Sequence, residues 1–381
     1  MSTNENTGHA DLSGAPTIDV AGIERELISL WKQASQEEGE AGVIRASMLN
    51  LIVYVPSATK SGRLSDAIVE ITSAHPCRAI LILADREAGE NLITAEVTSH
   101  CTIPDSSQKQ VCCEEVAITA TGSMVDEAPS TVAPLLLSDL PVYLWWRAVP
   151  QLTDRVFKRL VDISDRVIID SANFADPRGD LINLAAFLKE KPRWTAFTDL
   201  NWARLTAWRA LVAGFYDVSA YRPLMDQLGR VVIEYSPSSR DRESIAPRAL
   251  LLGGWLASRL GWKIDPLARV TTDEATTYEL QAEGRAVTIE FARTRRPRIE
   301  PGHLAFVALS SNASPSSTFN VRRSSDGTRI ETEVNVETRI QRVLSYESCG
   351  EGALIRRELE FSGHDRVFEQ AVTAAREFLG E

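Results

Sequence analysis

The chain lacks the features that mark membrane, secreted and nucleic-acid-binding proteins. Its longest apolar stretch, residues 249–260, is about half of the ~20 residues that a helix needs to cross a bilayer. The 381 residues carry 41 Lys and Arg against 52 Asp and Glu, a net charge of −11, so no surplus of cations is available for nucleic acid or anionic lipid. The N-terminus has no basic region followed by an apolar core, as a secretory signal would have. We therefore expect neither nucleic acid nor a membrane as a partner.

Cysteine and catalytic motifs are also scarce. The five cysteines are an odd number without Cys-x-x-Cys, which is typical of a reducing cytoplasm. No Gly-rich phosphate loop of standard spacing follows a predicted strand, and neither Gly-x-Ser-x-Gly nor His-Glu-x-x-His occurs. Residues 119–123 precede a predicted helix and form either an anion-binding turn or a simple turn. From the residues alone we predict no catalytic residues, no cofactor and no metal.

The hydrophobic pattern of the N-terminal part predicts an α/β domain over residues 18–170, after a disordered tail over residues 1–17. Continuous apolar runs at 51–55, 78–84 and 142–146 indicate buried strands, with a helix over 64–72 between the first two. Residues 94–103 and 111–121 are rich in Val, Ile and Thr and predict a hairpin. Further elements are expected as helices over 130–137 and 157–163 and a strand over 166–170.

Two further blocks follow. Residues 171–262 are predicted to be a mainly helical segment packed on the first domain, with helices over 181–188, 199–216 and 248–260 and a strand over 231–235. Residues 263–381 are predicted to form an antiparallel β domain, because short strands recur there between turns, and to end in an amphipathic helix over 365–379. The predicted fold class is α/β, or α+β over the whole chain.

The cysteines allow three interpretations. Cys112 and Cys113 are adjacent in a predicted strand, so their side chains point to opposite faces, while Cys101 can lie opposite Cys112 across the hairpin. Together with His100 these three could form a metal site, although the spacing matches no standard zinc pattern. Buried cysteines often act as small hydrophobic residues, whereas a redox switch needs an exposed thiolate. The redox candidates are Cys101, Cys112, Cys113 and Cys349, the last in a polar loop.

Tryptophan and arginine cluster in two segments, Leu140 to Arg147 and Asp199 to Arg209. These residue types are enriched in binding hot spots, and they also pack together in protein cores. If they bind a partner, the candidates are Trp145, Trp146, Arg147, Asp199, Trp202, Arg204, Trp208 and Arg209. A separate basic cluster has two possible roles. It binds an anion or an acidic partner, or it forms a charged sheet edge that resists aggregation. It consists of Arg293, Arg295, Arg296 and Arg298.

Several of these segments resemble the OpcA family, the glucose-6-phosphate dehydrogenase assembly proteins of cyanobacteria and actinobacteria. The resemblance rests on His75-Pro76-Cys77-Arg78, on Cys113-Glu114-Glu115, on residues 138–147, and on Asp199-Leu200-Asn201-Trp202 with Trp208-Arg209. It extends over most of the chain. It implies a non-catalytic cytoplasmic protein that binds glucose-6-phosphate dehydrogenase, promotes its active oligomer and controls entry into the oxidative pentose phosphate pathway. In cyanobacteria the family is also linked to thioredoxin-dependent redox control, which makes thioredoxin a second expected partner.

Two other functions compete with this one. The strand ends of the N-terminal α/β domain could hold a sugar phosphate or a nucleotide, as an enzyme or a sensor would. A weaker alternative is a redox relay through the four candidate cysteines.

Overall fold

The computed structural model describes residues 5–8, 19–37, 43–45, 47–56, 64–102, 110–237, 243–294, 299–313, 317–336, 342–345, 349–361 and 363–380. The chain forms two compact units, each built from several stretches of sequence. The first unit contains Met1–Ile169, Lys191–Thr198 and Cys349–His364, and the second contains Asp170–Glu190, Asp199–Ser348 and Asp365–Glu381. The three-block division stays a prediction. Of the predicted tail, residues 5–8 form strand β1, and the other residues of 1–17 lie outside the described part.

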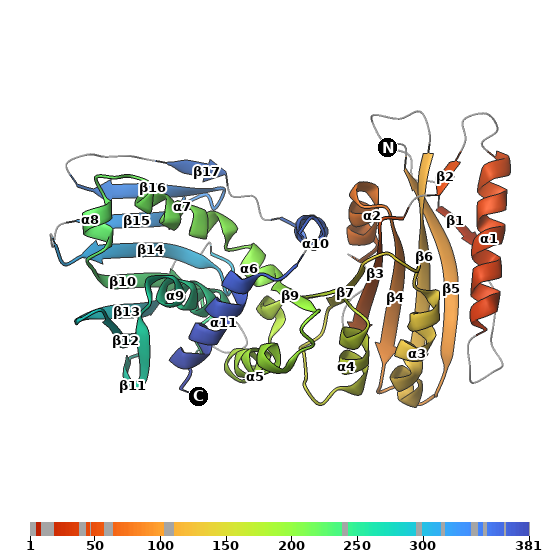
Figure 1. The fold of residues 1–381 in the computed structure, drawn as a ribbon, viewed down its shortest axis with the longest axis horizontal. Coiled ribbons are helices and arrows are strands. Elements are labelled where there is room, and N and C mark those ends of the chain that lie inside the picture. Colours follow the sequence, from red (N-terminus) through yellow and green to blue (C-terminus); the bar gives the residue numbers. More distant parts are fainter. Residues whose placement is uncertain are drawn as a thin grey trace. The chain divides into compact units, whose positions relative to one another are not determined.

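The first sheet has nine strands in the described part of the chain, and its centre is parallel (Figure 1). The order is β1-β5-β6-β4-β3-β7-β8-β9, and β2 pairs with β6. Strands β6, β4, β3, β7 and β8 run parallel, while β5 is antiparallel to β6. The strands are β1 (Glu5–Gly8), β2 (Val43–Arg45), β3 (Leu49–Pro56), β4 (Cys77–Asp85), β5 (Ile93–Thr102), β6 (Gln110–Thr121), β7 (Val142–Trp146), β8 (Arg166–Ile169) and β9 (Ala196–Asp199). Six of them, from β6 to β9, follow the doubly wound order 3-2-1-4-5-6.

The helices of the first unit explain the continuous apolar runs of its central strands. Leu51, Ile52 and Val53 of β3 are fully buried, as expected where helices cover both faces of a parallel sheet. The helices are α1 (Val20–Glu37), α2 (Leu64–Ala74), α3 (Ala128–Val132), α4 (Arg155–Asp162) and α10 (Glu351–Glu358), with 3-10 turns η3 (Gly122–Glu127) and η4 (Ala133–Leu135). The single helix predicted over 130–137 is instead one short helix between two 3-10 turns. Pro134, which has no N–H to donate, lies in the second of these turns.

The second sheet has eight strands among the described residues, in the order β11-β12-β13-β10-β14-β15-β16-β17. They are β10 (Leu228–Tyr235), β11 (Lys263–Thr271), β12 (Ala275–Ala282), β13 (Arg285–Arg293), β14 (Leu304–Ser311), β15 (Thr318–Arg323), β16 (Arg329–Asn335) and β17 (Val343–Ser345). The strand pairs within residues 263–345 are antiparallel in the described part, as predicted. The sheet as a whole is mixed, because β10 lies between β13 and β14 and runs parallel to β13. Strand β10 comes from the predicted helical segment. Its buried Val231, Ile233 and Tyr235 alternate with less buried residues and face the core of this unit.

Helices α7, α9 and α11 pack on the second sheet (Figure 1). The helices of this unit are α5 (Pro177–Glu190), α6 (Leu200–Ala203), α7 (Thr206–Tyr216), α8 (Arg222–Met225), α9 (Pro247–Leu260) and α11 (Arg366–Phe378), with the 3-10 turn η5 (Ser171–Asn173). The helix predicted over 199–216 is broken between α6 and α7. Helices α9 and α11 cross closely at Gly254, where a Cβ would overlap the backbone of Ala371 and Ala375.

Candidate functional site

The first tryptophan segment lies at the end of β7 and is buried. Trp146 stacks on Tyr54 of the neighbouring strand β3, with ring centroids 3.9 Å apart. Arg147 lies over the ring of Trp145, 5.1 Å from its centroid, and donates a hydrogen bond to Glu351 of α10 at 2.7 Å. These residues therefore connect the parallel sheet with α10 inside the first unit.

The second tryptophan segment is buried in the other unit. Trp202 of α6 is 2% exposed, and its indole nitrogen donates to Asp365 at 2.9 Å. The guanidinium carbon of Arg209 lies 3.5 Å from the centroid of the Trp202 ring, within the range of a cation–π contact. Trp208 of α7 is also buried. Arginine thus packs along a tryptophan face, as the core interpretation of this segment expects.

The eight residues selected as partner-binding candidates are divided between the two units. The four tryptophans and Asp199 are buried, and Arg147, Arg204 and Arg209 make contacts with neighbours in the same unit. In this conformation the rings offer no surface to a partner. A partner-binding role for these residues stays a prediction.

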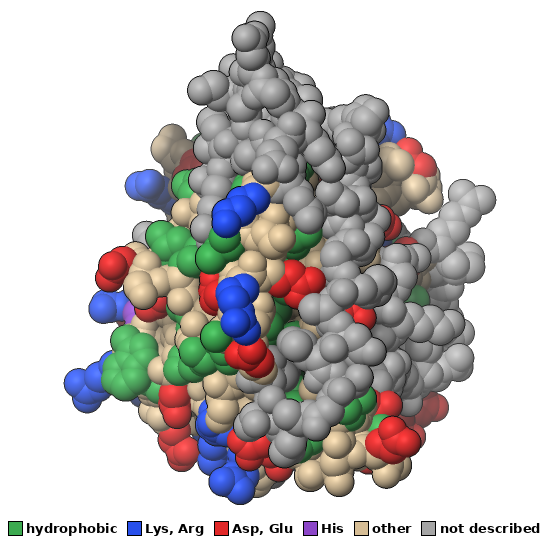
Figure 2. Space-filling view, turned by 90° about the vertical axis from the view of Figure 1, so that its right-hand side faces the viewer, with side chains coloured by type: hydrophobic (Ala, Val, Ile, Leu, Met, Phe, Trp, Pro, Cys, Tyr) green, Lys and Arg blue, Asp and Glu red, His purple; other side chains and the backbone are tan. Residues whose placement is uncertain are grey.

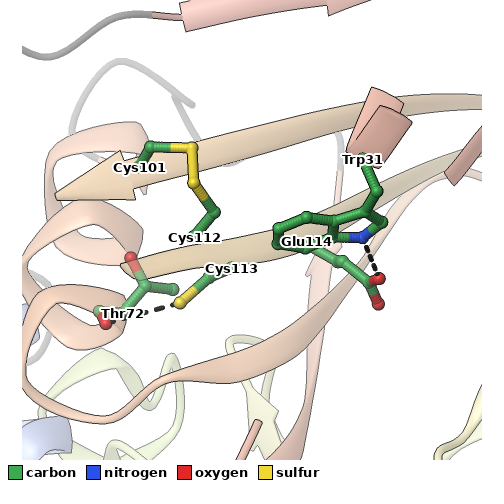
Figure 3. Close-up of a disulfide and its surroundings, with 6 residues drawn as sticks. All are labelled: Trp31, Thr72, Cys101, Cys112, Cys113 and Glu114. Carbon is green, nitrogen blue, oxygen red and sulfur yellow. Dashed lines mark hydrogen bonds between the residues drawn. A yellow bond between two sulfur atoms is a disulfide. The ribbon is translucent and has the colours of Figure 1, made fainter. Parts of the chain in front are cut away.

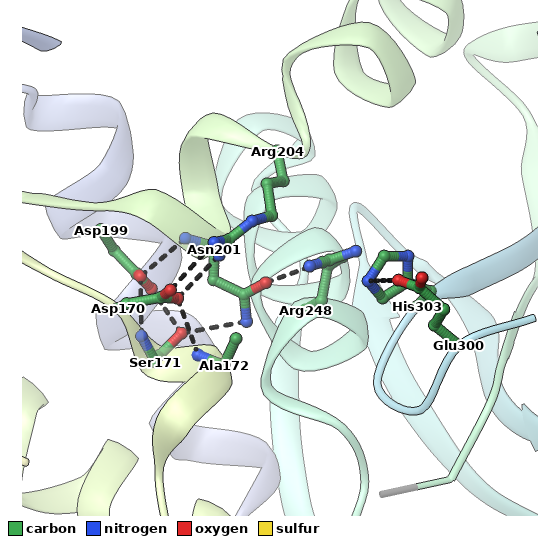
Figure 4. Close-up of polar contacts among 9 residues, drawn as sticks. All are labelled: Asp170, Ser171, Ala172, Asp199, Asn201, Arg204, Arg248, Glu300 and His303. Carbon is green, nitrogen blue, oxygen red and sulfur yellow. Dashed lines mark hydrogen bonds and ion pairs between the residues drawn. The ribbon is translucent and has the colours of Figure 1, made fainter. Parts of the chain in front are cut away.

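A buried polar network surrounds Asp199, the N-cap residue of α6 (Figure 4). Its carboxylate accepts hydrogen bonds from the backbone N–H of Ser171 at 2.9 Å, from the Ser171 hydroxyl at 2.5 Å and from the backbone N–H of Asn201 at 2.8 Å. The Asn201 side chain in turn donates to the Ser171 hydroxyl and accepts from Nε of Arg248 at 2.7 Å. The network therefore joins η5, α6 and α9, and it holds Arg248 in one orientation.

A second carboxylate, Asp170, lies beside this network. It accepts two hydrogen bonds from Arg204, at 2.7 and 2.9 Å, which is the bidentate arrangement that a guanidinium favours. Burial raises the pKa of Asp199 to about 6, and the neighbouring carboxylate of Asp170 also raises it. Hydrogen bonds from Ser171 and Asn201 act in the opposite direction. A shifted pKa of this kind occurs in structural networks as well as in active sites.

Cys101 and Cys112 form a disulfide across the β5–β6 hairpin (Figure 3). The two residues are direct partners in the antiparallel register, which confirms the expected hairpin and the opposed position of these cysteines. His100 contacts Glu115 at 2.9 Å rather than the sulfur atoms. In the described part of the chain, no group of three or more His, Cys, Asp or Glu residues is arranged to hold a metal ion.

The other cysteines are thiols. Cys77 and Cys113 are buried, and burial raises the pKa of Cys113 to about 11 and raises that of Cys77 as well. These thiols are therefore protonated at neutral pH and are poorly suited to thiol exchange. Cys349 is half-buried. A redox role for the candidate cysteines stays a prediction, and the Cys101–Cys112 disulfide is the pair that can change its covalent state.

Two sequence candidates for anion binding are engaged in structural contacts. Arg293 donates to the backbone carbonyls of Thr272 and Glu243, at 2.9 and 2.8 Å. The backbone N–H of Ser123, in the 119–123 turn, donates to the side chain of Asn91 at 2.8 Å. The other members of the basic cluster lie outside the described residues; they are Arg295, Arg296 and Arg298.

Sequence reasoning missed a group of aromatic and basic side chains in the first unit, called here the aromatic–basic patch, in which all members except the half-buried Lys191 are exposed. It consists of Lys191, Arg193, Trp194, Phe361 and His364. Trp194 is 66% exposed, the most exposed of the eight tryptophans, all of which lie in the described part, and Phe361 is 61% exposed. His364 donates to the carbonyl of Arg193 at 2.9 Å and accepts from Lys191 at 3.4 Å, so the two segments lie side by side. The available signal was Arg193-Trp194 after the proline that ends a predicted helix.

Sequence reasoning also missed a pocket of about 220 Å³ in the second unit. Its lining includes Ser171, Asn173, Asn201, Pro247, Arg248 and His303. These residues come from η5, α6, the first turn of α9 and the segment before β14. The sequence contains one signal for this pocket, because Arg248 follows Pro247 at the start of a predicted helix, a position where acidic residues are usual.

The charges on one face and the apolar character of the described helices bear on the expected partner classes. Basic and acidic side chains are interspersed over the described part of the face in Figure 2, in keeping with the net charge of −11. Among the described residues, no helix combines the length and the apolar character needed to span a bilayer.

Comparison with known proteins finds one family along most of the chain. Residues 69–186 match the glucose-6-phosphate dehydrogenase subunit N-terminal domain, and residues 195–372 match the C-terminal domain of the same subunit. The chain is 30% identical to the OxPP cycle protein OpcA of Nostoc punctiforme over 321 residues, which is 82% of this chain and 66% of that protein. It is 32% identical to the OpcA protein of Synechocystis sp. over 61% of this chain and 47% of that protein. The chain therefore spans roughly half to two thirds of the length of these relatives.

Solved structures offer a more distant likeness. An NAD binding oxidoreductase from Klebsiella pneumoniae is 10% identical to this chain with a TM-score of 0.48, and the match covers 87% of this chain and 95% of that one. A likeness at this level carries no inference about activity. The two domain matches, which together span residues 69–186 and 195–372, and the relatives at 30–32% identity show that this chain belongs to the OpcA family of glucose-6-phosphate dehydrogenase subunits.

Proposed function

We propose that this protein is a non-catalytic assembly factor and allosteric activator of glucose-6-phosphate dehydrogenase that acts in the cytoplasm. The observation that carries the proposal is the match of both subunit domains, N-terminal and C-terminal, in their expected order along the chain. The sequence contains none of the standard catalytic motifs considered above, which is consistent with a protein that activates another enzyme and catalyses no reaction itself. Such a protein activates an enzyme by binding its competent oligomer more tightly than the less active form.

The aromatic–basic patch is proposed as part of the surface that contacts the dehydrogenase. It contains an exposed tryptophan and an exposed arginine, two residue types that are enriched in interface hot spots. Because the patch is basic within an acidic chain, its complement on the partner is an acidic surface with an apolar centre. The buried tryptophans, in contrast, would reach a partner only after local unfolding.

The experiment is a titration of this protein into the dehydrogenase of the same organism at low glucose-6-phosphate concentration. Activity and oligomer mass are measured together, the latter by light scattering. We expect activity and the oligomer fraction to rise and saturate at a fixed ratio of the two proteins. If neither changes, the proposed function is wrong.

Redox control is proposed to act through the Cys101–Cys112 disulfide, with a thioredoxin-type dithiol as the reductant. The dithiol attacks one sulfur of the disulfide, and exchange leaves two cysteine thiols on this chain and an oxidised thioredoxin. The loop closed by the disulfide has a sequence separation of 11, so its removal is expected to cost about 3 kcal/mol of stability.

This redox proposal is tested with Cys101→Ser and with Cys349→Ser as the matched control, since Cys349 is a free thiol. Oxidised wild type and the control should unfold at a higher urea concentration than Cys101→Ser, and addition of reduced thioredoxin should remove the difference. The dehydrogenase titration is then repeated for each state. Equal activation by the oxidised and reduced proteins would exclude the regulatory role while leaving the assembly role intact.

A further inference from the structure

Three helices pack on one face of the second sheet (Figure 1). Phe215 of α7 contacts Phe319 of β15, and Phe378 of α11 contacts Phe291 of β13, with ring centroids 5.3 and 5.2 Å apart. A Cβ added to Gly253 of α9 would overlap the ring of Phe291 as well. The register places Phe291 and Phe319 on the same face of the sheet. All three helices therefore lie on that face.

The opposite face is apolar in its middle. Strands β10 and β14 are the fourth and fifth of the eight described strands, and their Val232, Phe306 and Ala308 point away from the helices. These side chains are half-buried, and Val232 is the direct partner of Ala308 in the register. On a sheet face that is exposed to water, polar residues usually occupy such positions. The apolar stripe, as these three residues are called here, is instead typical of the centre of an interface.

Charged side chains lie on both sides of the apolar stripe. On the side of β13, Arg230 donates a hydrogen bond to Glu290 at 2.6 Å, and the Arg230 side chain is 57% exposed. On the side of β15 and β16, a nitrogen of Arg322 lies 3.6 Å from an oxygen of Glu331, and Glu333 is exposed. An apolar centre with a polar rim is the usual anatomy of a protein–protein interface.

The two halves of this face differ in shape. A hollow of about 750 Å³ lies over β14, β15 and β16, and its described lining includes Phe306, Asn320, Arg322 and Glu333. On the other side of the apolar stripe, Arg230 is largely exposed and can extend from the face. One half therefore offers a hollow, and the other offers a long side chain that could enter it.

From this arrangement we propose that the open face of the second sheet binds the same face of a second copy of this chain. The two-fold axis would run along β14, so the apolar stripe of one copy would cover that of the other. Strand β10 would then lie over β15 of the second copy. Arg230 would enter the hollow there, between Glu290 of its own chain and Glu333 of the second copy, and the same contact would occur twice.

The area of the face is sufficient for a stable dimer. Eight strands at a spacing of ~4.8 Å, with eight residues in each of the central strands β10 and β14, give a face of about 34 Å by about 24 Å. This is about 800 Å², the area that each partner contributes to an interface of standard size. The proposal goes beyond the role in dehydrogenase assembly and is independent of it, because it concerns the isolated chain.

The first test is the mass of the isolated full chain in solution, measured by light scattering over a range of micromolar concentrations. We expect the mass of two chains. Ala308→Glu places the carboxylates of both copies next to the axis and should raise the dissociation constant at least about hundredfold, because like charges facing each other are strongly unfavourable. Thr271→Glu is the matched control and should remain a dimer. It adds the same charge to the exposed Thr271, which pairs with Thr276 on the helix-covered face.

A cross-linking experiment keeps the proposal testable if Ala308→Glu does not fold. In Ala308→Cys, a bismaleimide with a reach of about 10 Å, the distance between two stacked sheets, should join the two copies. Thr271→Cys should give no more cross-linked dimer than wild type, whose own free thiols set the background. Equal cross-linking of the two cysteine variants, or a dimer of Ala308→Glu as tight as wild type, would overturn the proposal.

A monomeric wild type would overturn it too. If Ala308→Glu then failed to activate the dehydrogenase, the open face would belong to the contact with that enzyme. If Ala308→Glu activated normally, the face would have no role in either assembly.

Discussion

Arginine beside tryptophan occurs in two opposite surroundings in this chain. In the second unit, Arg209 lies on the face of Trp202, which is almost fully buried and donates to Asp365. In the first unit, Arg193 and Trp194 are neighbours in sequence and both are exposed. The residue types are the same, but the first pair stabilises a core, whereas the second is available to another protein.

The difference has a local cause. Trp202 lies on the short helix α6 and contacts Phe368 of α11, with ring centroids 5.8 Å apart. Trp194 lies in the turn between α5 and β9, and turns of this kind run over the surface. A segment rich in Trp and Arg can form strong contacts. Whether those contacts are made inside the protein core or with a partner protein depends on the fold.

The largest expected effect is the loss of a buried ring. Trp202→Ala should lower the free energy of unfolding by about 3–5 kcal/mol, because it leaves a cavity and removes the partners of Asp365 and Arg209. Urea denaturation measures the change. The matched variant Trp194→Ala should stay within about 0.5 kcal/mol of wild type. Equal losses in the two variants would break the distinction between the buried and exposed tryptophans.

The buried network near Trp202 should produce a pH dependence. The pKa of Asp199 is raised in the folded state to about 6 from an ordinary value of 3.8, so the folded state binds this proton more tightly. The contribution of Asp199 is therefore fully present below about pH 4 and is lost as the pH rises through about 6. At 1.36 kcal/mol per pKa unit, the loss is up to about 3 kcal/mol.

Asp199→Asn isolates this contribution from the other titrating groups. The free energy of unfolding is measured for both proteins from pH 3.5 to 7.5. The difference, wild type minus variant, should fall between about pH 4 and 6 and be flat at higher pH. A flat difference over the whole range would mean that the carboxyl group titrates normally in the folded protein.

A smaller effect is expected for the cation–π contact. Arg209→Gln should cost about 1 kcal/mol, the range of such a contact when the ring is partly desolvated. Arg222→Gln is the control, since Arg222 donates to a backbone carbonyl at the protein surface. Thermal unfolding of the two variants gives the comparison. If Arg222→Gln lowers the stability as much as Arg209→Gln does, the position of Arg209 over the Trp202 ring contributes nothing to the stability of the fold.

The smallest effect on stability, and the largest on binding, is expected at the exposed tryptophan. Trp194→Ala should leave the fold unchanged and weaken the interaction with the dehydrogenase by about thirtyfold, the loss of one hot spot of about 2 kcal/mol. The activation titration measures it. Leu267→Ala, a change at an exposed apolar residue of the other unit, serves as the control and should activate like wild type. Activation that persists in Trp194→Ala would move the docking surface elsewhere.

Most of the regular elements could be predicted from local pattern alone. The apolar runs of β3, β4 and β7, the β5–β6 hairpin and the terminal helix α11 follow from periodicity, because those segments meet the same kind of neighbour along their whole length. Helix α10, in contrast, was not predicted. The sequence pattern indicates a polar loop over residues 347–352, which includes the first two residues of α10. The helix forms where Gly352 fits against Ala67 of α2, a contact between residues far apart in sequence.

The candidate sites show the same limit more strongly. The family, most of the strands and helices and the opposed position of Cys101 and Cys112 follow from the chain alone, because each of these depends on residues close in the chain or on a shared pattern of motifs. The burial of Trp202 and the exposure of Trp194 become visible only once the chain is folded. The same is true of the pocket that Ser171, Asn201, Arg248 and His303 share. The burial of a side chain and the electrostatic field around it depend on packing between segments that are distant in sequence. Local periodicity contains no information about which of these segments will pack together.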